Sequence, residues 1–87
     1  STSLPPAICA AAVQAIDIIA TDPARRERLH FASQLFRQQL RDKGIEAMAS
    51  STGPIVPVGV ASSQAAIQIA SRLENEGFLV GAIRPPT

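Results

Sequence analysis

The sequence has little of the side-chain chemistry that most often marks a functional site. It contains no tryptophan and no tyrosine, with one cysteine, one histidine and one methionine among its 87 residues. The single Cys9 excludes a disulfide within the chain and fits a reducing compartment. His30 and Cys9 are too few for a zinc site, which takes three or four ligands.

An excess of charge of one sign is also lacking. The formal net charge is +1, which gives no general electrostatic reason to bind nucleic acid or an anionic membrane. The densest basic stretch is Arg25-Arg26-Glu27-Arg28, where Glu27 and the neighbouring Asp22 dilute the positive field. Because no Tyr or Trp is present to stack on bases, nucleic-acid binding is the least supported of the readings.

Signals for export and for membrane insertion are absent from the sequence. The first residues lack the basic segment that opens a signal peptide. The longest apolar stretch, residues 7–20, is interrupted by Gln14 and Asp17 and is too short to span a bilayer. We therefore expect a cytoplasmic protein.

Apolar residues, by contrast, are abundant for so short a chain. Hydrophobic residues make up 46% of the sequence and charged residues 17%. A domain of this size buries only about 60–65% of the surface of its unfolded chain, so its core is marginal. We expect some of the apolar surface to pack against protein outside this chain. The start and the ending at residues 85–87 also do not resemble natural termini, so residues 1–87 are interpreted as a single, incomplete unit.

Three segments are predicted to be helical. Pro6 can open the first, residues 6–20, whose apolar surface runs nearly all round and requires burial on several sides. Residues 21–23 are a start signal for the second, which should run to residue 43, with a capping hydroxyl or carboxylate at its beginning. Ser62 or Ser63 can cap the third, residues 64–76. Gly44 and Gly77 suit the left-handed position just past a helix end.

Three short segments are predicted to be strands: residues 45–49, 55–60 and 78–83. Pro57 cannot donate to a ladder, which places the second at an edge. The order is therefore α-α-(β)-β-α-β, an α/β (α+β) fold with a small sheet and helices on one face. The last strand, helix and strand should form a right-handed crossover that makes the two strands parallel.

No residue pattern by itself predicts catalysis. Lys43 is the only lysine and lies at the exposed end of a helix, whereas a Schiff-base lysine needs a pocket that lowers its pKa. Cys9 lies in the apolar helix, where packing is the better interpretation. No nucleophile and base are placed together.

Several stretches do resemble one enzyme family, the α-oxoamine synthases, which are pyridoxal-phosphate enzymes of the class-II aminotransferase type. The hydroxyl-rich start that ends in Leu-Pro-Pro, residues 1–7, resembles the turn that opens the long interdomain helix of that family. Residues 22–29, residues 54–58 and the ending Ala-Ile-Arg-Pro-Pro-Thr, residues 82–87, are similar to later family segments in the same order. Departures occur at Gly59 and in the turn at residues 61–63, and these concern local packing.

The resemblance implies a fold and a reaction. Residues 1–21 would form a phosphate-contact turn and interdomain helix, and residues 22–87 part of the C-terminal small domain of a fold-type-I enzyme. The family is homodimeric and condenses an amino acid with an acyl thioester on pyridoxal 5'-phosphate, losing carbon dioxide. Ser1 and Thr2 match hydroxyls that reach the cofactor phosphate of the neighbouring subunit, and Thr87 matches a substrate contact. Without the resemblance, Ser1 and Thr2 would be read as helix caps.

The ending Arg-Pro-Pro-Thr is typical of the branch that uses L-alanine and a pimeloyl thioester, carried either by CoA or by a carrier protein. The alternatives are the 2-amino-3-oxobutyrate CoA ligase and 5-aminolevulinate synthase branches, or a non-enzymatic dimerisation or interaction module. In the family the Schiff-base lysine lies upstream of the segment that matches Ser1. The isolated chain is therefore expected to be inactive, with no catalytic residue of its own and no metal.

Overall fold

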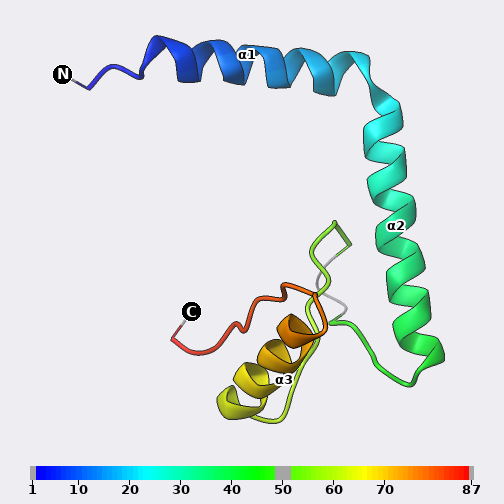
Figure 1. The fold of residues 1–87 in the computed structure, drawn as a ribbon. Helices are drawn as coiled ribbons and strands as arrows, with labels where there is room; N and C mark the ends of the chain where they lie inside the picture. The colour runs from blue at the N-terminus through cyan, green and yellow to red at the C-terminus, as the bar shows by residue number, and fades with distance from the viewer. Residues whose placement is uncertain (1, 49–51, 87) are drawn as a thin grey trace.

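The computed structural model describes residues 2–48 and 52–86 of the chain. Within these ranges it contains three helices, α1 (Pro6–Thr21), α2 (Pro23–Asp42) and α3 (Ser63–Asn75), which Figure 1 shows in chain order. All three predicted helices are confirmed. Each predicted end lies within one residue of the observed end.

The helices are arranged in an open shape rather than around a common core. α1 and α2 are bent by 78° relative to one another, with Asp22 between them. The loop at residues 52–56 faces α2, and α3 with the C-terminal segment lies farther from α2 than this loop, whereas α1 extends away from all of them (Figure 1). The radius of gyration is 17.6 Å, compared with about 12 Å for a compact domain of this length.

Burial is correspondingly slight. No hydrophobic residue in the described ranges is buried, and Ser33 is the one buried residue there, 7% exposed. Cys9, for which packing was predicted, is exposed on α1. The apolar surplus expected from the composition is therefore exposed surface. Its large side chains on α1 and α2 are Ile8, Val13, Ile16, Ile18, Ile19, Leu29, Phe31, Leu35 and Phe36.

None of the helices in the described ranges combines the length and the apolar character needed to cross a membrane by itself. α1 and α2 meet that requirement only when taken together, across their 78° bend.

α2 and α3 end in the same backbone motif. At the end of α2, Gly44 has φ 77° and donates to the Arg41 carbonyl, while Ile45 N–H donates to the Leu40 carbonyl at 2.8 Å. The residues at the end of α3 repeat the pattern: Gly77 has φ 92°, and Phe78 N–H donates to the Leu73 carbonyl at 2.8 Å. This is the Schellman arrangement, in which glycine takes the left-handed position and an apolar residue follows. The predicted role of both glycines is confirmed.

The helix starts differ from one another. Ser62 caps α3 as predicted, because its Oγ accepts a hydrogen bond from Ala65 N–H at 3.1 Å. The capping side chain predicted for α2 is wrong. Its first residue follows Asp22, whose carboxylate instead forms an ion pair with Arg25 at 2.7 Å, and Thr21 donates backwards to the Asp17 carbonyl. A nearby cation competes successfully with the backbone N–H groups for the carboxylate.

The predicted sheet is not confirmed. Within residues 2–48 and 52–86 there is no strand, only an isolated antiparallel bridge between Ala47 and Val58, with Met48 N–H donating to the Pro57 carbonyl at 2.8 Å. Residues 78–83 have no ladder partner in those ranges, so the parallel crossover is not formed. Sheets are stabilised by pairs across strands rather than by the propensity of one strand. Pro57 further limits pairing beside this bridge because it has no N–H to donate.

Candidate functional site

The first candidate site is the turn that precedes α1. Ser1 lies outside the described residues, and Thr2 is exposed and non-helical. The N-cap of α1 is Pro5, and no side chain caps this helix. Helix capping, the alternative role for Thr2, is therefore not what the structure shows. A helix start attracts anions, but Pro5 and Pro6 lack N–H groups, so an anion here would depend strongly on hydroxyl donors.

The second candidate site is the ending of the chain. Thr87 lies outside the described residues, while Arg84, Pro85 and Pro86 are exposed and the Pro85–Pro86 peptide is cis. This segment runs beside α3, whereas Thr2 precedes the free end of α1 (Figure 1). The structure therefore places the predicted phosphate contact and the predicted substrate segment on separate arms of the chain.

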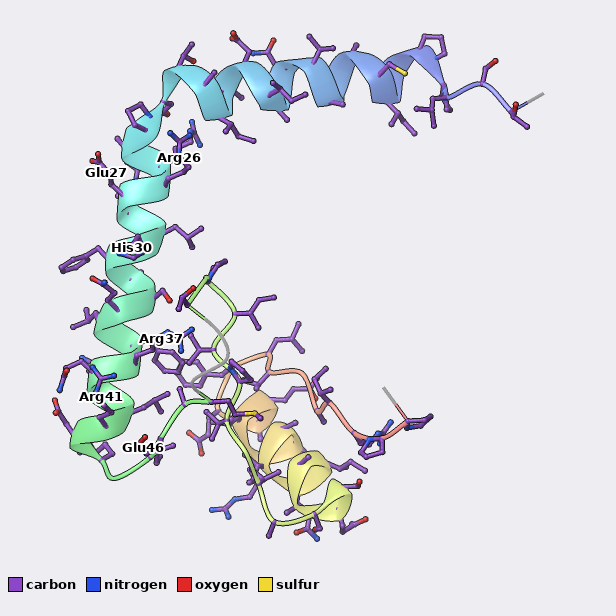
Figure 2. The ribbon with its side chains drawn as sticks, turned by 180° about the vertical axis from the view of Figure 1, so that it is seen from behind. Arg26, Glu27, His30, Arg37, Arg41 and Glu46 are labelled. Atoms are coloured by element: carbon purple, nitrogen blue, oxygen red, sulfur yellow. The ribbon has the colours of Figure 1, made fainter. Side chains whose placement is uncertain are left out.

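A group of contacts that was not anticipated from the sequence ties α2 to the loop at residues 52–56. Ser33 Oγ donates to the Gly53 carbonyl at 2.9 Å. The Arg37 guanidinium donates to the same carbonyl at 3.1 Å and to the Ile55 carbonyl at 3.0 Å. Figure 2 shows Arg37 pointing from α2 toward this loop. We call these two side chains, Ser33 and Arg37, the loop clasp. They are four residues apart and so share one helix face.

Next to the loop clasp is a wide, shallow hollow of about 460 Å³. It lies between α2 and the loop and is lined by Arg26, Glu27, Leu29, His30, Ser33, Thr52, Gly53 and Pro54. His30 is exposed, and in the described part of the chain no hydrogen bond joins it to a nucleophile or an acid. Nor do three potential metal ligands gather anywhere in residues 2–48 and 52–86. The hollow is thus a surface depression whose lining contains no paired nucleophile and base.

The surroundings of Lys43 do not suit a lysine that binds a cofactor. It is exposed and forms the C-cap of α2, where its backbone N–H donates to the carbonyls of Gln39 and Leu40. Nothing in this setting desolvates the ammonium group, which a Schiff-base lysine requires. The described residues therefore contain no candidate for that role.

The joint between α1 and α2 is held by polar contacts. Asp22 N–H donates to the Ile18 carbonyl at 2.9 Å, and an Arg26 guanidinium nitrogen donates to the Ile19 carbonyl. Figure 2 shows Arg26 on the inner side of the bend and Glu27 on the outer side. Arg25 and Arg26 thus have different partners, since Arg25 pairs with Asp22 at the start of α2, whereas Arg26 reaches the end of α1. The sequence showed both only as members of a basic run.

Comparison with known proteins gives a consistent result along the whole chain. The family model described as aminotransferase class I and II matches residues 1–87. Over all 87 residues the chain is 46% identical to the 8-amino-7-oxononanoate synthase of Xylella fastidiosa (strain M12), covering 21% of that protein. It is 42% identical to the synthase of the same name from Stenotrophomonas maltophilia (strain R551-3), again covering 21%. It is 41% identical to that of Stutzerimonas stutzeri (strain A1501), covering 22%.

The chain therefore spans about a fifth of the length of these relatives. No solved structure matches the chain significantly.

Proposed function

Because the chain belongs to the class I and II aminotransferase family, we propose that it forms part of an 8-amino-7-oxononanoate synthase. This cytoplasmic enzyme of biotin synthesis condenses L-alanine with a pimeloyl thioester and releases carbon dioxide. The observation that carries the proposal is the 41–46% identity to synthases of this name along the entire chain. The other α-oxoamine synthase branches are the nearest alternatives.

The cofactor of the proposed enzyme is pyridoxal 5'-phosphate, which supplies an electron sink for the carbanion of the amino acid. In this chain, Ser1 and Thr2 would hold its phosphate. Thr2 fits that role because its side chain is exposed ahead of a helix start and is not used as a cap. Its hydroxyl would donate to a phosphate oxygen, and the positive end of α1 would add to the attraction. Thr87 would contact the substrate.

A homodimer follows from the same proposal. Thr2 and the segment that leads to Thr87 lie on separate arms, which supports an arrangement in which the α1 arm serves the active site of the neighbouring subunit. The extensive exposed apolar surface supports packing against further protein. It also favours the second candidate function, a non-enzymatic interaction module.

An exchange experiment tests the proposal. The 87 residues that match in the Xylella fastidiosa synthase are replaced by this chain, and condensation of L-alanine with pimeloyl-CoA is assayed. We expect turnover within about tenfold of the unaltered synthase, since the rest of the enzyme supplies the Schiff-base lysine. A chimera that folds as a dimer and binds pyridoxal phosphate but gives no turnover would contradict the proposal. The interaction-module alternative predicts that outcome.

The same chimera tests Thr2. Loss of a hydrogen bond to a charged group costs about 1.5–3 kcal/mol, so Thr2→Val should weaken pyridoxal-phosphate binding about 10- to 100-fold. Ser3→Ala is the matched control and should leave binding nearly unchanged. The isolated chain, tested alongside, should give no turnover and no borohydride-trappable adduct at Lys43.

A further inference from the structure

The contact between Arg26 and the Ile19 carbonyl lies at the place that decides where α1 points. The last four carbonyls of a helix have no partner within the helix. In α1 that group begins with Ile18, whose carbonyl accepts from Asp22 N–H, and continues with Ile19, whose carbonyl accepts from Arg26 on α2. A cation at this end is also favoured by the helix dipole. Arg26 is thus a side-chain link from the second helix to the end of the first.

Little else holds α1 in its orientation. Among the helices in the described part of the chain, α1 contacts α2, and neither of them contacts α3. The long apolar side chains of α1 are exposed. The angle between α1 and α2 therefore depends on the residues at the joint.

That angle matters because a small rotation of α1 at the joint displaces its free end by a large distance. With 16 residues, it is about 24 Å long at 1.5 Å per residue. A rotation of about 10° at the joint therefore moves its free end by about 4 Å. Hydrogen bonds to a phosphate tolerate far less, since donor and acceptor must come within about 3 Å. The turn that carries Thr2 precedes that free end.

From these observations we propose that Arg26 is a positioning residue. It fixes the bend between α1 and α2 and thereby sets where Thr2 can meet a phosphate group. The role at the joint rests on the geometry alone, and the role toward the phosphate rests on the function proposed above. Arg26 itself touches neither cofactor nor substrate.

The joint is tested first in the full chain, without cofactor. Spin labels are attached to Cys9 on α1 and to a cysteine introduced by Gln39→Cys on α2, both exposed positions. The distance distribution between them is then measured by pulsed electron resonance, in samples diluted with unlabelled chain. We expect a narrow distribution that becomes at least twice as broad in Arg26→Ala and narrows again in Arg26→Lys. Arg28→Ala, which removes a neighbouring cation, should leave it unchanged. An unchanged distribution in Arg26→Ala would overturn the proposal.

The role toward the phosphate is tested in the synthase chimera. Arg26→Ala should weaken pyridoxal-phosphate binding about tenfold, with kcat at saturating cofactor changed less than twofold and with unaltered thermal stability. Arg26→Lys should recover most of the affinity. Unaltered affinity in an active chimera would overturn the positioning role. An inactive chimera whose label distances still respond to Arg26→Ala would instead count against the proposed enzyme.

Discussion

Ser33 on α2 donates a hydrogen bond to the carbonyl oxygen of Gly53, 20 residues later, at 2.9 Å. Ser33 is the one buried residue in the described ranges, and its partner belongs to a loop with no helix or strand of its own. Together with Arg37, this contact connects α2 to the second half of the chain. The loop clasp is therefore the part of the structure where single substitutions should have the clearest effects.

Ser33→Ala should loosen the loop without unfolding α2. A hydrogen bond of this kind contributes about 1 kcal/mol, so local opening should become about fivefold more frequent. The measurement is the NMR exchange rate of the Met48 amide, which donates to the Pro57 carbonyl at 2.8 Å. Ser71→Ala on α3 makes the same chemical change at an exposed position and serves as the control. Equal rates in the two variants would argue against the clasp.

Arg37→Lys should weaken the loop clasp nearly as much as Arg37→Ala. One guanidinium nitrogen of Arg37, Nη2, donates to both the Gly53 and the Ile55 carbonyls. A lysine ammonium lies one bond closer to the helix and has no rigid plane that fixes the direction of its N–H groups. We expect amide chemical shifts of residues 53–56 to move toward unstructured values in both variants. Arg41→Ala is the matched control, because Arg41 bonds to Gln38 on its own helix. If Arg37→Lys preserved the shifts fully, the two-carbonyl geometry would not be needed.

Ser62→Ala should fray the start of α3. Loss of the bond from Ala65 N–H to Ser62 Oγ costs about 1 kcal/mol, as is typical of a serine N-cap. The expected result is lower helicity by circular dichroism and about fivefold faster exchange of the Ala65 amide. Ser63→Ala changes the first helical residue instead and should raise helicity slightly. If Ser63→Ala lowered helicity by the same amount, the bond to Ser62 Oγ would not be the cause of the loss.

The isolated chain should self-associate through its apolar surface. Sedimentation velocity is expected to show a mass that rises with concentration, together with binding of an apolar fluorescent dye. Ile16→Glu should reduce both effects, since Ile16 is 66% exposed on α1. Gln14→Glu adds the same charge to the same helix and should reduce them less. A monomer at every concentration that binds no dye would refute this expectation.

The features that the sequence predicted well are those with local signals. Pro6, Gly44 and Ser62 each determine a helix end through their own backbone or side chain, so a stretch of a few residues suffices to recognise them. The strand predictions are wrong because a strand needs a partner to pair with, and a short apolar segment shows only that its residues would suit a strand. The loop clasp was missed for a related reason. Ser33 and Gly53 are ordinary residues in sequence, and only the three-dimensional path of the chain brings them together.

The candidate site likewise has some features that the sequence could predict and others that only the structure shows. The exposure of Thr2 ahead of α1 agrees with the sequence-based interpretation, whereas the roles of Ser1, Thr2 and Thr87 remain predictions. Arg26 could not be selected from the run of arginines, because Arg25 and Arg26 differ only in the direction their side chains take at the bend. Only the three-dimensional structure shows that Arg26 donates to the Ile19 carbonyl across the joint, whereas Arg25 pairs with Asp22.

The absence of a buried apolar residue in the described ranges has a calorimetric consequence. Unfolding raises the heat capacity mainly by exposing apolar groups to water, and a compact domain of 87 residues would gain about 1.0–1.3 kcal/mol/K. Here most of those groups are already hydrated, so the gain should be a small fraction of that value. The isolated chain should therefore lose its helices gradually on heating, without a sharp heat-absorption peak, and packing of the α1 face against further protein should restore one.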